Sequence, residues 1–357
     1  MKLCILSDAS SLHIVEWAQF FAQQGHDVSV ISDNPADIAG ATVHLIPKYE
    51  YTIHIPVISA AYQIIRKAID IRHLLRTIQP DILHSHYANI YGYLASYTGF
   101  HPHILTCHGS DLLFHPERSR IEKYFIKRAL HHADKITLPS EEMYRKAVEY
   151  GADPIKITKI QYGINIKEFP LTINKPKKIH LLSTRMLTTR YKTEIIIEAF
   201  SLIHNKYPGL FLDIVGDGPE RSRLEQIVAD KKIRKNVNFW GTVDHSQINK
   251  FYQQATVYIT ASPTDGLSIS LLEAFASGVF PIIPDNQSNR NVLEMGFKVT
   301  LYQVNSPVDL AEKIIKVTEN LPEIGPLIKT NRQLIEELFD RSKNLSRIET
   351  LYKDLIR

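Results

Sequence analysis

Two acidic side chains, Asp265 and Glu273, lie eight positions apart where a loop runs into a helix. The stretch 262–278 opens with turn residues, continues with apolar residues at helical spacing and closes on glycine, which predicts a helix starting near 266–268. A helix start carries free backbone N–H groups and a positive dipole end, so it can bind a phosphate. Glu273, about two turns further on, falls on roughly the same face as Asp265, so each acid could hold one sugar.

The same two residues also fit a purely structural role. Asp265 could cap the N-terminus of the helix, and Glu273 could be a solvated acid on the helix surface. The spacing alone leaves both interpretations open.

Length and composition narrow the class of protein. A chain of 357 residues with 44% apolar residues predicts two hydrophobic cores. The net charge of +4 does not suggest wholesale nucleic-acid binding. Cys4 and Cys107 lie in apolar runs and are expected to be buried free thiols, which fits a reducing cytoplasm. The N-terminal apolar run is too short for a signal peptide, and no apolar run reaches transmembrane length.

The first half of the chain alternates strands and helices. Residues 3–7 and 27–32 are predicted strands around a helix at 17–24, and such a unit implies a parallel sheet whose ligands gather at the carboxyl ends of its strands. Two further strands, at 81–86 and 104–111, bring histidines to that edge. His84 and His86 have the spacing of a metal-binding pair, but no third ligand suggests itself. The sequence contains no Asp-x-Asp, so no metal ion is predicted.

Two helices of the first half are basic, at 62–78 and 118–132. Their charges could form an ordinary solvated face. Alternatively, they could meet anionic lipid or a lipid-linked acceptor.

The composition changes in the middle of the chain, since 13 of the 16 histidines lie at or before His132. A polar stretch with two prolines at 166–178 is the predicted linker. Strands and helices then alternate again, which predicts a second doubly wound α/β domain. The last helix is expected at 330–357, after Pro322 and Pro326, with a bend or break near Asp340.

Taken in order, these features resemble the retaining family-4 glycosyltransferases of the GT-B fold, also called glycosyltransferase group 1. The resemblance rests on Gly25-His26-Asp27-Val28, on the segment from Thr106 to Asp111, on Arg185 with Lys192, and on the Asp265/Glu273 pair. It covers nearly the whole chain. It implies two Rossmann-like domains facing each other across a cleft, an acceptor-side domain at 1–168 and a nucleotide-sugar-binding domain at 169–335. A C-terminal helix at 336–357 is expected to pack back on the first domain.

The resemblance also assigns roles to residues. Glu273 is expected to bind the ribose hydroxyls, Asp265 the hydroxyls of the donor sugar, and the amides at 266–268 the diphosphate. Two cations neutralise the charge that develops on the departing diphosphate, and a histidine reaches the sugar from the opposite domain. The implied catalytic residues are His108, Arg185, Lys192 and Asp265, and the implied donor-binding residues are Gly216, Gly241, Thr242, Val243, Gly266, Leu267, Ser268 and Glu273.

Some positions depart from the family pattern. Asp265 stands where the family usually has glutamate, and its shorter side chain would hold the donor sugar differently. Arg190 could compete for the role of Lys192. Without the resemblance, Arg185 and Lys192 are two surface cations, and His108 is a structural residue at a strand end.

The leading hypothesis is a retaining transferase that takes sugar from a nucleotide diphosphate to an acceptor hydroxyl, in cell-surface glycan or glycolipid assembly. It needs no metal and no cofactor besides the donor, and its acceptor is a sugar, a lipid-linked sugar or a protein. A cytoplasmic location is expected, and peripheral association with the inner face of the membrane is an open alternative. The alternatives are a non-catalytic nucleotide-sugar-binding subunit and a nucleotide-sugar epimerase.

Overall fold

The computed structural model describes residues 1–47, 56–173, 178–264 and 267–356. The chain divides into two compact units. Unit 1 comprises Met1–Tyr162 and Ser342–Arg357, and unit 2 comprises Gly163–Arg341. The domain boundaries expected at 168/169 and 335/336 differ from these divisions by six residues each, the first lying later in the chain and the second earlier.

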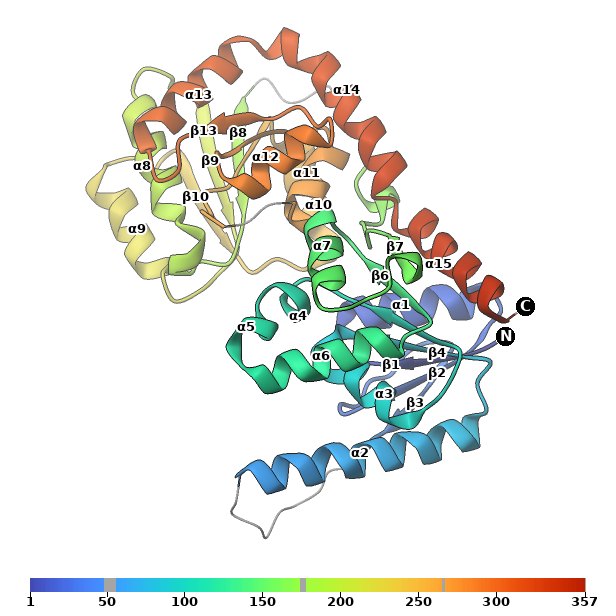
Figure 1. The fold of residues 1–357 in the computed structure, drawn as a ribbon. Coiled ribbons are helices and arrows are strands. Elements are labelled where there is room, and N and C mark those ends of the chain that lie inside the picture. Colours follow the sequence, from blue (N-terminus) through green and yellow to red (C-terminus); the bar gives the residue numbers. More distant parts are fainter. Residues whose placement is uncertain (48–55, 174–177, 265–266, 357) are drawn as a thin grey trace. The chain divides into compact units, whose positions relative to one another are not determined.

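Unit 1 is built on a seven-stranded parallel sheet of order β3-β2-β1-β4-β5-β6-β7 (Figure 1). Its strands are β1 (Lys2–Leu6), β2 (Asp27–Ser32), β3 (Ala41–Leu45), β4 (Ile82–His86), β5 (His103–Thr106), β6 (Lys135–Leu138) and β7 (Ile157–Lys159). Its helices are α1 (Leu12–Gln23), α2 (Pro56–Ile78), a π-helical turn (Tyr87–Gly92), α3 (Tyr93–Thr98), α4 (Ser110–Leu113), α5 (His115–Arg118), α6 (Arg120–His132), α7 (Glu141–Glu149), a 3-10 turn (Pro154–Lys156) and α15 (Arg341–Ile356).

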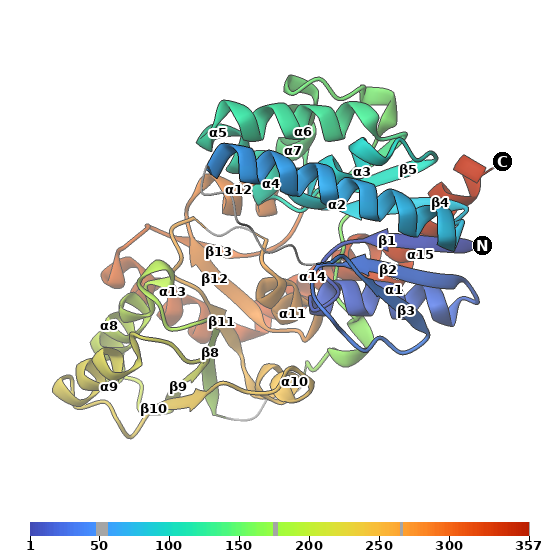
Figure 2. The ribbon, with the colours of Figure 1, turned by 90° about the horizontal axis from the view of Figure 1, so that it is seen from below.

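Side chains of the strands of unit 1 alternate between two cores. Leu3 and Ile5 of β1 pack with α1 and α15, whereas Cys4 and Leu6 pack with α2 on the other face. Figure 2 shows α2 and α3 covering one face of this sheet and α1 the other. This period of two in a buried parallel strand explains why the sequence reads as a continuous apolar run. Cys4 and Cys107 are buried free thiols, as predicted, and burial raises the pKa of both.

Unit 2 repeats the plan with a six-stranded parallel sheet of order β10-β9-β8-β11-β12-β13. Its strands are β8 (Ile179–Thr184), β9 (Leu210–Val215), β10 (Val237–Gly241), β11 (Val257–Ile259), β12 (Phe280–Pro284) and β13 (Thr300–Tyr302). Its helices are α8 (Thr193–Ile203), α9 (Arg221–Asp230), α10 (His245–Gln254), α11 (Ile269–Ala276), α12 (Gln287–Glu294), α13 (Pro307–Glu319) and α14 (Leu321–Leu338), with 3-10 turns at Ile166–Glu168 and Thr189–Tyr191. The expectation of two doubly wound α/β domains is confirmed.

The predicted linker at 166–178 is partly wrong. Ile166 and Phe169 are buried in the core of unit 2, because an apolar pair spaced one helical turn apart anchors this segment. The chain passes between the units earlier, after Tyr162, and Ile164 is hydrogen-bonded to the returning segment at Phe339 and Arg341. Residues 174–177 lie outside the described part of the chain.

The last predicted helix also needs correction. The structure has two helices, with α14 beginning at Leu321 rather than at 330. Pro322 fits the first turn, where its missing N–H has no intrahelical partner to lose, and Pro326 lies inside the helix. The predicted break near Asp340 is confirmed, because α14 ends at Leu338 and α15 starts at Arg341. Among the described residues, no helix combines the length and the apolar character needed to cross a membrane.

Candidate functional site

The strand order of unit 2 creates a crevice between β8 and β11. The connection after β8 leads to α8, which packs in one core, and the connection after β11 leads to α11, which packs in the core on the opposite face. Ligands of doubly wound sheets bind where neighbouring connections diverge in this way, outside the carboxyl ends of the strands. Arg185 follows β8, and Ser268 precedes α11.

Helix α11 starts where the sequence predicts it. Ser268 is its N-cap, and its hydroxyl accepts a hydrogen bond from the N–H of Leu271 at 3.3 Å. The helix stops at Gly278, whose left-handed φ of 71° suits a glycine after the last turn. Asp265 and Gly266 lie outside the described residues, so their expected contacts to sugar and diphosphate stay predictions.

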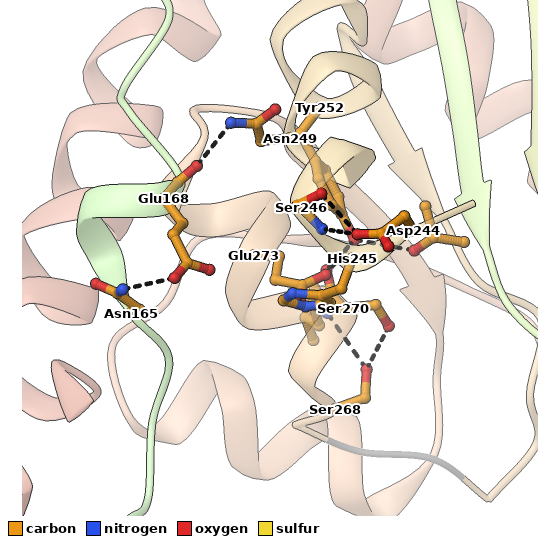
Figure 3. Close-up of polar contacts among 12 residues, drawn as sticks. Asn165, Glu168, Asp244, His245, Ser246, Asn249, Tyr252, Ser268, Ser270 and Glu273 are labelled. Carbon is orange, nitrogen blue, oxygen red and sulfur yellow. Dashed lines mark hydrogen bonds and ion pairs between the residues drawn. The ribbon is translucent and has the colours of Figure 1, made fainter. Parts of the chain in front are cut away.

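Glu273 is a buried carboxylate, with 4% of its surface exposed. One oxygen accepts from the hydroxyl of Tyr252 at 2.9 Å, and the other lies 3.0 Å from Nε2 of His245 (Figure 3). The alternative of a solvated helix acid is therefore wrong. Two ionised carboxylate oxygens offer about four acceptor sites, so the pair keeps capacity for further donors such as ligand hydroxyls.

Tyr252 and His245 were missed in the sequence. Both lie on α10, seven residues apart, and therefore on the same face of the helix two turns from each other. The Tyr252 hydroxyl also contacts Thr184 and the carbonyl of Ser270, and burial beside Glu273 raises its pKa well above the usual value. A neutral tyrosine thus holds the acid in place. The available signal in the sequence was the seven-residue spacing of His245 and Tyr252, which places both on one face of the helix that follows Gly241.

The glycines expected to bind donor have a packing role in the structure. A Cβ on Gly216 would lie 2.2 Å from the carbonyl oxygen of Arg185, and the N–H of Gly216 donates to Gly241 at 2.8 Å. The loops after β8, β9 and β10 are thereby held together at one edge of the sheet. Thr242 and Val243 follow in the connection to α10. Contact of any of these residues with a donor stays a prediction.

The two expected cations lie on the same connection after β8. Arg185 is partly buried, with its guanidinium 5.2 Å from the ring centre of Tyr191. Lys192 precedes α8 in a left-handed conformation with φ of 51°, and its ammonium lies 3.9 Å from Glu194. Arg190 also lies over Tyr191, at 5.7 Å. The assignment of diphosphate contacts among these cations stays a prediction.

His108 lies in unit 1, just after β5. Buried Asp111 accepts hydrogen bonds from the backbone N–H groups of His108 and Gly109 at 3.0 and 2.8 Å, which fixes the loop. Nε2 of His108 is 3.0 Å from Nδ1 of His86, and Tyr87 stacks on the ring. Burial lowers the pKa of His108 well below its usual value, so the imidazole is neutral near pH 7. A neutral ring of this kind can exchange hydrogen bonds with sugar hydroxyls.

Two doubly wound units, with a fixed carboxylate and cations at the switch point of the second, define a protein of the nucleotide-binding α/β class. Comparisons with known proteins are more specific. The profile of Glycosyl transferase 4-like proteins matches residues 2–140, and that of Glycosyl transferases group 1 matches residues 164–337. The chain belongs to the group 1 glycosyltransferases with the GT-B fold, as the sequence resemblance predicted.

Curated relatives are distant. The alpha-monoglucosyldiacylglycerol synthase of Acholeplasma laidlawii is 26% identical over 233 residues, which is 61% of this chain and 58% of that protein. The uncharacterized glycosyltransferase MJ1178 of Methanocaldococcus jannaschii is 24% identical over 317 residues, 88% of this chain and 85% of that one. The chain thus spans less than two thirds of the A. laidlawii enzyme.

Solved structures share the fold. Anabaena Alr3699/HepE in complex with UDP matches with a TM-score of 0.77 at 15% identity, covering 99% of this chain and 100% of that one. A glycosyltransferase from Rickettsia africae matches with a TM-score of 0.78 at 18% identity, covering 100% and 99%.

Proposed function

We propose that the chain transfers a sugar from a uridine diphosphate sugar to a hydroxyl of a lipid acceptor, with retention of the anomeric configuration. The observation that carries the proposal is Glu273, a buried carboxylate held by Tyr252 and His245 with acceptor capacity to spare. An acceptor pair of this kind suits the two neighbouring hydroxyls of a ribose.

The connection after β8 supplies the positive charge that the reaction needs. Breaking the sugar–phosphate bond leaves the diphosphate more negative, and Arg185 and Lys192 would stabilise that charge where it develops. The charge that Arg185 and Lys192 would stabilise develops only when the sugar–phosphate bond breaks. We therefore favour a catalytic role over a non-catalytic binding subunit. The choice of uridine is supported by the similar HepE structures, which were solved with UDP and with UDP-glucose.

A lipid acceptor is supported by two of the relatives. The synthases of A. laidlawii and Streptococcus pneumoniae are both named for monoglucosyldiacylglycerol, and the second matches 67% of this chain at 26% identity. In unit 1, α6 exposes Ile121 and Tyr124 at 64% and 57%, next to the exposed cations Arg120 and Lys127. Apolar and basic side chains on one helix face suit an anionic lipid surface.

The basic faces are smaller than the sequence suggests. Lys67 of α2 is paired with Asp33 at 2.6 Å, Arg72 donates to the carbonyl of Thr98, and Arg128 of α6 donates to Ser96. These charges serve the fold of unit 1. The proposed lipid surface therefore rests on α6 near Ile121 and Tyr124.

The transfer reaction can be tested directly. The purified chain is incubated with UDP-glucose or UDP-N-acetylglucosamine and vesicles containing diacylglycerol, and products are identified by mass spectrometry, with the anomeric configuration read by NMR. An α-linked product from an α-linked donor is expected. An inverted product, or turnover unchanged by Glu273→Gln, would contradict the proposal.

The lipid surface needs a separate assay. Replacing Ile121 and Tyr124 with serine should reduce sedimentation with anionic vesicles and leave UDP binding unchanged. Leu202→Ser, which removes a similarly exposed apolar side chain from α8 of unit 2, is the matched control. Equal sedimentation of all three proteins would remove α6 from the proposal.

A further inference from the structure

Three histidines that are far apart in the sequence meet at the carboxyl edge of the sheet of unit 1. His13 belongs to the first turn of α1, His86 ends β4, and His108 follows β5. Because β1, β4 and β5 are neighbours in the sheet, the connections that follow them leave from the same edge. Each ring offers one nitrogen, and the three nitrogens lie within 4.8 Å of one another.

We propose that His13, His86 and His108 form a binding site for a divalent transition-metal ion such as Zn²⁺. Three imidazoles are a ligand set found in zinc sites that keep a fourth position open. Zinc takes histidine nitrogens at about 2.0–2.1 Å, so the nitrogens of a tetrahedral site lie about 3.3 Å apart. The ligand nitrogens, which lie within 4.8 Å of one another, would have to approach to about 3.3 Å, and rotation of the rings can supply this movement.

The state of His86 supports this assignment. Its side chain is fully buried, and its Nδ1 is 3.0 Å from Nε2 of His108. Its Nε2 is also buried and has no hydrogen-bond partner among the described residues. Buried polar atoms of folded proteins are rarely left without a hydrogen-bond partner. Nε2 of His86 is therefore a candidate to bind the ion directly. Alternatively, the ring binds the ion through Nδ1, once the ion replaces the contact of Nδ1 with His108.

His84 is excluded from the ligand set by its own contacts. Its Nδ1 is 2.5 Å from the hydroxyl of Tyr352, and its Nε2 is 2.7 Å from the hydroxyl of Thr106. Both nitrogens are therefore committed to the core of unit 1. His84 and His86 lie on the same face of β4 and their rings stack with centres 4.5 Å apart, so their spacing does bring them together. The contacts of His84 with Tyr352 and Thr106 nevertheless leave it outside the cluster of three histidines.

Neighbouring side chains hold the rings in place. Asp111 is a buried carboxylate that accepts a hydrogen bond from the backbone N–H of His108 and fixes the loop that carries this ring. Trp17 meets the ring of His86 edge-on at 4.7 Å, and Tyr87 stacks on His108 at 4.2 Å. Outer contacts of this kind fix the orientation of ligand rings.

The ligand chemistry also sets the selectivity. Imidazole nitrogens suit Zn²⁺, Co²⁺, Ni²⁺ and Cu²⁺, whereas Mg²⁺ and Ca²⁺ prefer oxygen ligands. The site is therefore distinct from any magnesium that would accompany a nucleotide diphosphate. The metal-binding measurement does not require transferase activity, so it can fail while the proposed function holds.

The test is metal binding by the full chain, freed of any purification tag and treated with a chelator. Titration with Zn²⁺ against a coloured zinc chelator should show one equivalent bound per chain, and Co²⁺ should give the intense visible absorption of a four- or five-coordinate site. A tenfold excess of Mg²⁺ should leave both readings unchanged. Absence of a saturable equivalent would overturn the proposal.

Substitutions locate the ion. His13→Gln and His86→Gln should each weaken zinc binding at least about tenfold, and His101→Gln should leave it unchanged, since His101 is an exposed histidine of unit 1 paired with Asp134. His13 lies in the first turn of a helix, so its variant keeps the test valid if His86→Gln does not fold. One equivalent that survives His13→Gln, or that is lost in His101→Gln, would place the ion elsewhere and refute the site.

Discussion

Replacing Glu273 with glutamine tests the centre of the donor site with little change in shape. Glutamine keeps one carbonyl oxygen as acceptor, and its amide can donate to Tyr252, whose hydroxyl can turn toward the carbonyl of Ser270 at 3.1 Å. The network around residue 273 can therefore be rebuilt. The free energy of unfolding should fall by only about 1 kcal/mol.

Donor binding should respond much more strongly. A hydrogen bond to a charged group contributes about 1.5–3 kcal/mol and a neutral one about 0.5–1.5 kcal/mol, so each ribose hydroxyl should lose about 1–1.5 kcal/mol. Two hydroxyls give a loss of about 2–3 kcal/mol, which is a rise of about 30–150-fold in the Kd for UDP. Isothermal titration calorimetry measures this directly.

A second ligand isolates the ribose contact. UDP lacking both ribose hydroxyls should bind the parent protein weakly, and Glu273→Gln should weaken it little further, because the interacting groups are already absent. Tyr252→Phe is the structural control, since it removes the hydroxyl 2.9 Å from Glu273 but keeps the carboxylate. It should cost stability and change the Kd less than tenfold.

Three results would refute the reasoning. Glu273→Gln could bind UDP within threefold of the parent, or Tyr252→Phe could lose as much affinity as Glu273→Gln. The third is an equal effect of Glu273→Gln on UDP with and without ribose hydroxyls. Each would reduce Glu273 to a structural acid of α11.

Other perturbations follow from the same structure. Gly216→Ala should destabilise unit 2 by about 3 kcal/mol in urea unfolding, because its Cβ would lie 2.2 Å from a carbonyl oxygen. Gly209→Ala is the control, since no atom lies within 4 Å of its added Cβ, and it should leave stability unchanged. Equal stability of the two variants would contradict the close approach at Gly216. Arg185→Ala should lower kcat about 100–1,000-fold in the transferase assay, and a loss below tenfold would remove it from the leaving-group site. Burial lowers the pKa of His103 to about 3, whereas the same group in the unfolded chain takes up its proton near pH 6.5. The free energy of unfolding should therefore fall as the pH drops from about 6.5 toward 3, and this group should contribute about 1.4 kcal/mol per pH unit. His103→Gln should flatten that slope when unfolding of unit 1 is followed by the fluorescence of Trp17, the only tryptophan in the sequence of that unit. An unchanged slope would show that His103 does not cause the pH dependence.

The sequence by itself determined the two doubly wound units and the start of α11. Apolar runs of strand length alternating with helical periods permit few topologies, because crossover connections between parallel strands are right-handed. The cap at Ser268 and the stop at Gly278 are local signals that need no tertiary partner. The resemblance to the group 1 glycosyltransferases rested on the order of such local segments.

Tertiary structure alone decided which side chains meet. Glu273 becomes a fixed acceptor only because α10 brings Tyr252 and His245 to it, from 21 and 28 residues away. His13 reaches His86 and His108 because sheet order makes β1, β4 and β5 neighbours although they are distant in sequence. Periodicity predicts the face of an element on which a residue lies, but the partner on that face depends on how the elements pack, and packing depends on the whole chain.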